Sequence, residues 1–194
     1  MILFLPPAPH TGAFFDTVRG RLSDLATEAA TYPGYGGVPA TAPTIEAYAA
    51  SLLPQPLGTA LVGFHTGCLV ALEMALREPS LGQIVLVDVP LLTAARRAEY
   101  AGRLDPDDPA QDAFRAAFAH DTDRALATLD HPATLVATDS SLFEPTRRAA
   151  SIVRDCGLVE ARHISKPAFE SAAMAELLRG ILSDISQEAP PGAA

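Results

Sequence analysis

Residues 60–79 read ALVGFHTGCLVALEMALREP, and this stretch decides the fold. An aliphatic run precedes Gly63, and the apolar residues after Gly67 recur at helical spacing. The two glycines allow the backbone to bend sharply and let a helix pack close to a strand. The stretch therefore predicts a buried strand, a tight turn with His65 at its apex, and an amphipathic helix. In an open parallel sheet, the carboxyl ends of strands are where ligands bind.

The rest of the chain alternates short apolar runs with segments of helical periodicity. We expect five strands, over residues 2–5, 58–63, 83–88, 133–137 and 158–164. Besides the helix after His65, we expect helices over residues 13–29, 45–53, 145–156 and 169–185. Thr44 is the expected N-cap of the helix over 45–53, and Gly157 is expected to end the helix over 145–156. The pattern predicts an α/β fold: a mostly parallel sheet with helices on both faces and right-handed crossovers.

One segment interrupts this alternation. Between residues 91 and 130 the sequence turns to Ala, Arg and Asp with two or three short helices, so we expect a small helical cap above the sheet. Residues 1–90 and 131–185 would then form one core domain. Residues 186–194 contain a Pro-Pro-Gly sequence and are expected to be a flexible tail.

The composition excludes several classes of function. The chain has 194 residues, enough for one domain with a substantial core, and contains no apolar run of about 18 residues that would span a membrane. Its net charge of −9 disfavours nucleic acid or an anionic membrane as a partner. Cys68 and Cys156 each fall in a predicted helix and lack disulfide or metal-ligand spacing. We therefore expect reduced thiols in a cytoplasmic protein with no metal and no cofactor.

Four blocks of the sequence, in this order, resemble the α/β-hydrolase family. Residues 5–12 (LPPAPHTG) are similar to its oxyanion loop, and residues 32–37 (YPGYGG) to the loop usually written PGxGxS. Residues 61–67 (LVGFHTG) have the spacing of its nucleophile elbow, G-x-S-x-G, and residues 84–88 (IVLVD) are similar to the strand before its cap. The resemblance covers nearly the whole chain and implies a short version of that fold without its two leading antiparallel strands.

The chain departs from the family at the catalytic positions. The family uses a Ser at the elbow, an acid after a later strand and a His after the last strand. Here His65 stands at the Ser position, and Asp139 is the expected acid. The expected His loop, residues 165–169 (SKPAF), contains no His, and His163 falls within the predicted strand. The resemblance therefore implies a rebuilt or retired site in place of an ordinary serine esterase.

His65 has several possible roles. It could act as a base for water, a thiol or an alcohol, as a nucleophile that forms an acyl-imidazole, or as a hydrogen-bond donor to substrate. It could also serve packing alone, since His accepts unusual backbone angles better than most residues. His10, in the loop expected to face His65, could form a proton-transfer pair with it or lie in solvent. Asp139 could orient an imidazole or cap the following turn.

The remaining candidates concern the rim of the predicted pocket. The resemblance implies an oxyanion hole made by the backbone at Thr66 and in the loop of residues 8–11, which includes Pro9. Cys68, in the first turn of its helix, is either a thiolate favoured by the helix dipole or a buried, inert thiol. Asp88 ends its strand and either contacts substrate or serves structure.

Basic residues offer further contacts. Lys166 lies near the missing His position and could offer its charge to substrate. The arginine pairs at 96–97 and 147–148 are expected to be solvated helix faces, unless an acidic partner docks there.

The resemblance implies an enzyme acting on an acyl ester or thioester, by acyl transfer or thioester cleavage in a biosynthetic pathway. His65 would be its base or nucleophile, and its partner a small-molecule or carrier-bound acyl substrate. Two other hypotheses stay open, because a fold alone does not choose a function. One is a lyase, cyclase or isomerase that uses His65 and His10 for proton transfer. The other is a non-catalytic pseudo-hydrolase that binds a small molecule or a partner.

Overall fold

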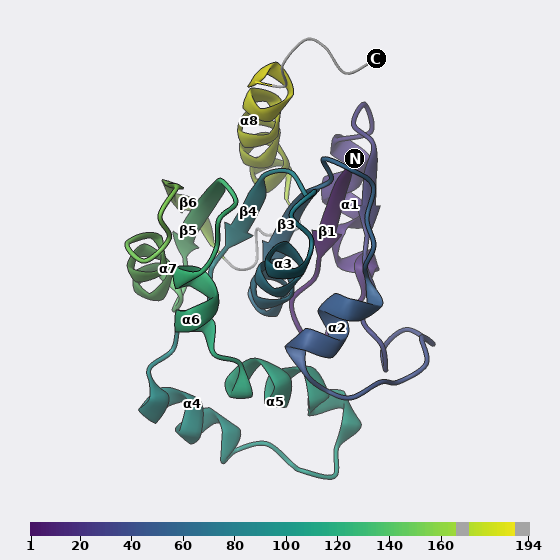
Figure 1. Cartoon of the computed structure of the whole chain (residues 1–194), viewed down its shortest axis with the longest axis vertical. Helices are drawn as coiled ribbons and strands as arrows, with labels where there is room; N and C mark the ends of the chain where they lie inside the picture. Colours follow the sequence, from purple (N-terminus) through teal and green to yellow (C-terminus); the bar gives the residue numbers. More distant parts are fainter. Residues whose placement is uncertain (166–170, 189–194) are drawn as a thin grey trace.

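The computed structural model describes residues 1–165 and 171–188. These residues form a six-stranded sheet in the order β2-β1-β3-β4-β5-β6, in which every neighbouring pair is parallel (Figure 1). The strands are β1 (Ile2–Leu5), β2 (Thr27–Ala29), β3 (Ala60–Phe64), β4 (Ile84–Val87), β5 (Ala133–Asp139) and β6 (Cys156–Ser165). The helices are η1 (Gly12–Phe15), α1 (Asp16–Arg21), α2 (Ile45–Ser51), α3 (Thr66–Arg77), α4 (Ala94–Ala101), η2 (Pro109–Gln111), α5 (Asp112–Ala119), α6 (Thr122–Ala127), α7 (Phe143–Ala150) and α8 (Ala172–Glu188).

Helices cover both faces of the sheet and create two apolar cores. Successive side chains of a strand point to opposite faces. Leu61 and Leu86 therefore face one core, to which α2 and α3 contribute. Val62 and Val85 face the other, to which α1 and α8 contribute. Burial on both faces explains why the central strands read as continuous apolar runs. The predicted α/β class, with a parallel sheet between two helix layers, is confirmed.

The turn between β3 and α3, residues 63–67, is called the elbow below. Its apex residue His65 has φ 48° and ψ −112°, a backbone conformation that residues with a side chain rarely adopt. A Cβ on Gly63 would lie 2.5 Å from the Gly67 carbonyl oxygen, and a Cβ on Gly67 would lie 2.0 Å from the Leu5 carbonyl oxygen. Only glycine fits at both positions, which confirms the tight turn predicted from their spacing.

Two regions differ from the sequence prediction. The helix expected over residues 13–29 ends early, and its last part forms the edge strand β2, which pairs with β1. Three residues are too few to show a hydrophobic periodicity, so this segment is a strand because its main chain pairs with β1. The helix expected over residues 145–156 ends at Ala150, so Cys156 and Gly157 belong to β6 and Gly157 ends no helix. The expected cap at Thr44 is confirmed, because its side chain accepts a hydrogen bond from the Ala47 N–H at 3.1 Å.

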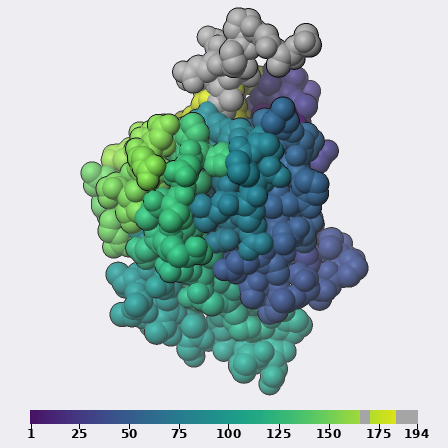
Figure 2. All heavy atoms as spheres, viewed as in Figure 1, coloured from purple at the N-terminus to yellow at the C-terminus, as the bar shows by residue number. Residues whose placement is uncertain are grey.

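Residues 91–130, called the cap segment below, contain α4, η2, α5 and α6. Figure 1 shows α4 and α5 beyond the carboxyl ends of the strands, whereas α6 lies beside α3. In Figure 2 the teal part of this segment forms the lower edge of the molecule, against the blue and green surface of the core. The division of the chain into core, cap and tail stays a prediction; α8 continues to Glu188, and residues 189–194 lie outside the described residues. None of the helices described has the length and apolarity needed to cross a membrane.

Candidate active site

The sheet register brings His65 and Asp88 together. Phe64 pairs with Val87 in the parallel ladder of β3 and β4, so the residues that follow them emerge side by side at the carboxyl edge. The His65 N–H donates to the Val87 carbonyl at 3.0 Å, and the Asp88 N–H donates to the Val136 carbonyl at 2.9 Å. Asp88 also has a positive φ, 54°. The His65 Nε2 and Asp88 Oδ2 atoms are 3.8 Å apart, which is an ion-pair distance when the imidazole is protonated.

The Asp88 carboxylate is fully buried and held by Thr138, at the end of β5. The Thr138 N–H donates to Oδ1 at 2.9 Å, and its hydroxyl donates to Oδ2 at 2.5 Å. Burial acts to raise the pKa of Asp88, but His65, Thr138 and Ser140 stabilise the charged form and together lower that pKa below its ordinary value. The structure therefore fixes a buried anion directly beneath the elbow.

A cavity of about 650 Å³ opens at this edge of the sheet. It is lined by His65 and Thr66 of the elbow, by Ala8 of the loop after β1, by Ser140 and Ser141 of the loop after β5, and by side chains of α4 and α5. The His65 side chain is 22% exposed, whereas that of Asp88 is wholly inaccessible. A cavity of this size accommodates a small organic molecule. His65 is thus the member of the pair that a bound molecule can touch.

Backbone donors lie beside the imidazole. Thr66 is the first residue of α3 and lines the cavity. The first N–H groups of a helix have no intrahelical partner, and the helix dipole adds positive potential there. Pro9, expected to contribute to an oxyanion hole, has no N–H to donate; it is exposed and does not line the cavity. The neighbouring Ala8, which lines the cavity and has an N–H, takes its place as candidate.

Two expected partners of His65 lie elsewhere. His10 is exposed, and its ring packs against that of Phe14 with centroids 5.0 Å apart and the ring planes tilted by 48°. Asp139 is exposed and follows an irregularity in the pairing of β5 with β6. Neither residue lines the cavity. Within the described part of the chain, the carboxylate at ion-pair distance from His65 is that of Asp88.

Two other predicted substrate contacts, Cys68 and Lys166, are also not placed at the cavity by the structure. Cys68 is fully buried, and its Sγ lies 3.2 Å from the carbonyl oxygens of both Gly63 and Val87. Burial raises the pKa of the Cys68 thiol well above its ordinary value, and the nearby Asp88 carboxylate adds to this. The structure thus supports a buried, unreactive thiol. Lys166 lies outside the described residues.

The sequence suggested that the paired arginines lie on solvated helix faces, but three of them reach the cavity. Arg96 and Arg97 of α4 and Arg148 of α7 all line it. Arg147, the neighbour of Arg148, stays on the outer surface and pairs with Glu144 and Glu160. The sequence could not show which arginines face the cavity, because the cavity is formed by packing of the cap segment against distant parts of the chain.

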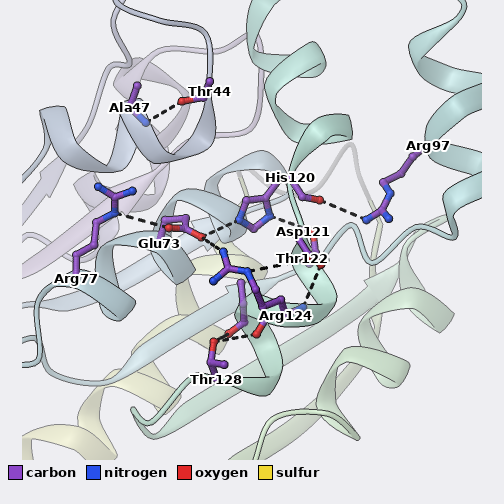
Figure 3. Close-up of polar contacts among 11 residues, drawn as sticks. Thr44, Ala47, Glu73, Arg77, Arg97, His120, Asp121, Thr122, Arg124 and Thr128 are labelled. Atoms are coloured by element: carbon purple, nitrogen blue, oxygen red, sulfur yellow. Dashed lines mark hydrogen bonds and ion pairs between the residues drawn. The ribbon is translucent and has the colours of Figure 1, made fainter.

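A second cluster of ionisable groups surrounds Glu73 on α3 (Figure 3). The His120 Nε2 atom lies 3.2 Å from Glu73 Oε1, and Glu46 has a ligand atom within 4.8 Å of both. Such a group could in principle hold a cation. However, Arg77 and Arg124 approach the Glu73 carboxylate to 3.6 and 3.5 Å. Two guanidinium groups already neutralise this carboxylate and repel a metal ion.

Comparison with known proteins gives similar folds and one local sequence match. No protein-family model matches the chain. Over 57 residues it is 44% identical to a pimeloyl-[acyl-carrier protein] methyl ester esterase of Aromatoleum aromaticum; the match covers 28% of this chain and only 23% of that esterase.

Solved structures match over nearly the whole chain. A lipase-esterase related protein from Clostridium acetobutylicum has a TM-score of 0.77 at 15% identity, over 95% of this chain and 93% of that one. A hydrolase from Pseudomonas aeruginosa has a TM-score of 0.75 at 16% identity, over 93% and 89%. An enol-lactonase from Burkholderia xenovorans has a TM-score of 0.71 at 13% identity, over 96% and 91%. The parallel sheet, the glycine-framed elbow and these likenesses together show that the chain has the α/β-hydrolase fold.

Proposed function

We propose that the chain is an enzyme that acts on an acyl ester or thioester, with His65 as its catalytic base. One observation carries this proposal: the His65 imidazole lines the cavity at the elbow apex, and the buried Asp88 carboxylate lies 3.8 Å from its Nε2 atom. When a base accepts a proton it becomes a cation, and a buried anion at this distance stabilises it. A histidine kept only for packing would need neither the cavity nor the carboxylate.

The reaction follows from the positions of these groups. Because Nε2 is turned toward Asp88, the nitrogen that accepts the proton in this proposal is Nδ1. A water, alcohol or thiol gives its proton to Nδ1 as its oxygen or sulfur bonds to the acyl carbon, and the carbonyl electron pair moves onto the carbonyl oxygen. The N–H groups of Thr66 and Ala8 stabilise this oxyanion. The intermediate then expels the alcohol or thiol, which takes the proton back from the imidazolium.

Water as the attacking group gives hydrolysis, and an alcohol or thiol gives acyl transfer. In the variant mechanism His65 is the nucleophile: Nδ1 bonds to the acyl carbon, the C–O or C–S bond of the substrate breaks, and the departing alcohol or thiol takes the proton that the acyl-imidazolium gives up. Water then cleaves the acyl-imidazole, which releases the acid and restores the neutral imidazole. The local match to an esterase whose substrate is carrier-bound supports an ester or thioester, and makes a carrier-bound acyl group a candidate substrate. Cleavage or transfer in a biosynthetic pathway is part of the same proposal.

The test is His65→Asn, because Asn tolerates a positive φ. We expect kcat/KM toward a panel of acyl esters and acyl thioesters to fall by at least about 100-fold, with an unchanged melting temperature. Unchanged turnover would refute the role of His65. Rapid quenching followed by mass measurement distinguishes base from nucleophile, since only the nucleophile leaves an acyl group on the chain.

His10→Asn is the matched control. His10 is exposed and does not line the cavity, so its loss should leave turnover within about twofold. A large loss would instead favour the proton-transfer pair of a lyase, cyclase or isomerase. If the wild-type chain turns over no ester or thioester but binds ligands in the cavity, the non-catalytic alternative is correct.

A further inference from the structure

We propose that the cavity contains an anion-binding subsite formed by Arg97 and Arg148, and that its ligand is an apolar molecule bearing a carboxylate or phosphate group. This inference deepens the proposed function and rests on it in one respect, that the cavity is the substrate site. Arg97 and Arg148 are called the arginine subsite below.

The charge of the cavity opposes that of the chain. The protein has a net charge of −9, yet the side chains lining the cavity that carry a full charge at neutral pH are Arg96, Arg97 and Arg148. No Asp or Glu of the described residues lines it. A cavity lined by charges of one sign concentrates their field. An anionic group is therefore attracted into a cavity of a protein that otherwise repels anions.

The two guanidinium groups of the subsite are held in place without being neutralised. Arg97 donates to the His120 carbonyl oxygen at 3.3 Å (Figure 3), and Arg148 donates to the Leu91 carbonyl oxygen. Among the described residues, no carboxylate lies within ion-pair distance of either. A guanidinium has five N–H donors, so one bond to a carbonyl leaves several for a ligand.

Arg96 differs from these two and is left out of the subsite. Its guanidinium lies 3.8 Å from Glu99 and stacks over the Tyr100 ring at 5.6 Å. The Glu99 carboxylate already partly neutralises Arg96; this pairing, and not exposure, sets it apart, because Arg148 is exposed as well.

The rest of the cavity wall is largely apolar. Tyr100 of α4 faces Phe118 of α5 with ring centroids 5.7 Å apart, and Phe114 and Leu142 also line the cavity. Such a wall favours an acyl chain or another apolar body. The planar fork of a guanidinium matches the two oxygens of a carboxylate or phosphate. Together these features select a ligand with one apolar part and one anionic part.

The first experiment measures binding by calorimetry with three probes that share a heptyl chain: octanoate, heptyl phosphate and the neutral octanamide. We expect at least one of the two anions to bind about tenfold more tightly than the amide, and this preference to shrink in about 0.5 M salt. The anion that binds more tightly identifies the source as a carboxylate or a phosphate. Equal affinity for all three probes would overturn the proposal.

The second experiment removes the charges one at a time. Arg97→Gln and Arg148→Gln should each weaken binding of the preferred anion by about tenfold and leave the amide unaffected. Arg148→Lys keeps the charge but loses the fork and should give an intermediate loss. Arg147→Gln is the matched control, because Arg147 is adjacent on α7 but pairs with Glu144 and Glu160. An equal loss in this control would show an effect of net charge alone and overturn the subsite.

Thermal melting of each variant shows whether it is folded, and the wild-type probe preference stands without any variant. Turnover separates this inference from the proposed function. Arginine-dependent anion binding without turnover of any ester would overturn the proposed function and retain the subsite. Turnover of neutral and anionic esters at equal kcat/KM, with no anion preference in binding, would overturn the subsite and retain the proposed function.

Discussion

Helix α3 connects two histidine–carboxylate pairs that differ in their surroundings. At its N-terminus, His65 lies 3.8 Å from Asp88, and its side chain is 22% exposed to the cavity. Along its side, Glu73 lies 3.2 Å from His120, whose side chain is wholly buried. The second pair is also closed by its neighbours, since His120 Nδ1 contacts the Thr122 hydroxyl at 3.1 Å. Position at a strand end, rather than residue type, is what makes a pair accessible to a ligand.

The two pairs therefore have different consequences for the molecule. The pair of Glu73 and His120 joins α3 to the cap segment, and its His120 carbonyl oxygen also holds Arg97 at the cavity (Figure 3). The pair of His65 and Asp88 joins two strand ends that the sheet already fixes. We expect loss of the first pair to affect stability and loss of the second to affect activity. The same chemical change, carboxylate to amide, tests both.

Glu73→Gln should have the largest effect. It removes a buried carboxylate that faces His120, Arg77 and Arg124, so three partners lose their anion. We expect the free energy of unfolding to fall by about 3 kcal/mol and the melting temperature by roughly 6 to 12 °C. Turnover at 25 °C should stay within several-fold. Denaturant unfolding and calorimetry measure the change.

The control for this substitution is Glu99→Gln. Glu99 is exposed and pairs with Arg103 on the surface of α4, and such a pair contributes under about 1 kcal/mol. Similar losses in the two variants would contradict the structural role assigned to Glu73.

Asp88→Asn should act on activity instead. The amide can still accept from the Thr138 N–H and donate to its hydroxyl oxygen, and Asn tolerates the positive φ, so the loss of stability should be about 1 kcal/mol. Without the anion, the protonated imidazole loses its counter-charge. We expect kcat/KM to fall by about 100-fold, equivalent to about 2.7 kcal/mol. Asp139→Asn, at an exposed residue outside the cavity, should change it by less than about twofold. A reversed order would restore Asp139 as the partner of His65.

The elbow and the core were predictable because close contacts and burial constrain residue types in a pattern that a short stretch of sequence displays. Gly63 and Gly67 are required by contacts of 2.5 and 2.0 Å that any Cβ would make, and the apolar runs of β3 and β4 require cover on both faces. The strand β2 was not predictable, since three residues become a strand only through pairing with β1. Gly157 was misread because glycine is also tolerated inside a strand such as β6.

The carboxylate of the site could not be chosen from sequence, because the choice depends on the order of strands. β4 lies next to β3, whereas β5 lies one strand further, about 10 Å from β3. Asp88 is therefore the acid adjacent to His65, although the family resemblance pointed to Asp139. Which arginines line the cavity depends equally on packing between distant segments: Arg96 and Arg97 both line it, whereas Arg148 does and its neighbour Arg147 does not. A family resemblance assigns a role to a residue by its position in the sequence, whereas the strand order determines which residues are its neighbours in space.

A smaller effect is expected on the pH dependence of stability, to which the charge of the Asp88 carboxylate contributes. The pKa of Asp88 is lowered in the folded protein, so its charge contributes stability that is fully present above the unfolded value, about 3.9, and is lost as pH falls through the folded pKa. The stability difference between wild type and Asp88→Asn should thus be constant above about pH 5 and shrink below about pH 4. Urea unfolding across this range measures it. A difference that stays constant at the lowest pH would contradict a lowered pKa.

The smallest expected effect is that of Glu73→Gln on the labelling rate of Cys68, which lies on α3 between the two pairs. Its thiol is fully buried with a pKa raised well above the ordinary value, whereas Cys156 at the start of β6 is half-buried. A thiolate-specific reagent at about pH 8 should label Cys156 first, and Cys68 at least about 100-fold more slowly, through opening of the elbow. In Cys156→Ser the remaining rate reports that opening alone. Adding Glu73→Gln to Cys156→Ser should leave this labelling rate unchanged if the elbow is stabilised by its close-packed glycines and the adjoining strands. Acceleration would show that α3 opens as one unit and that the two pairs are coupled.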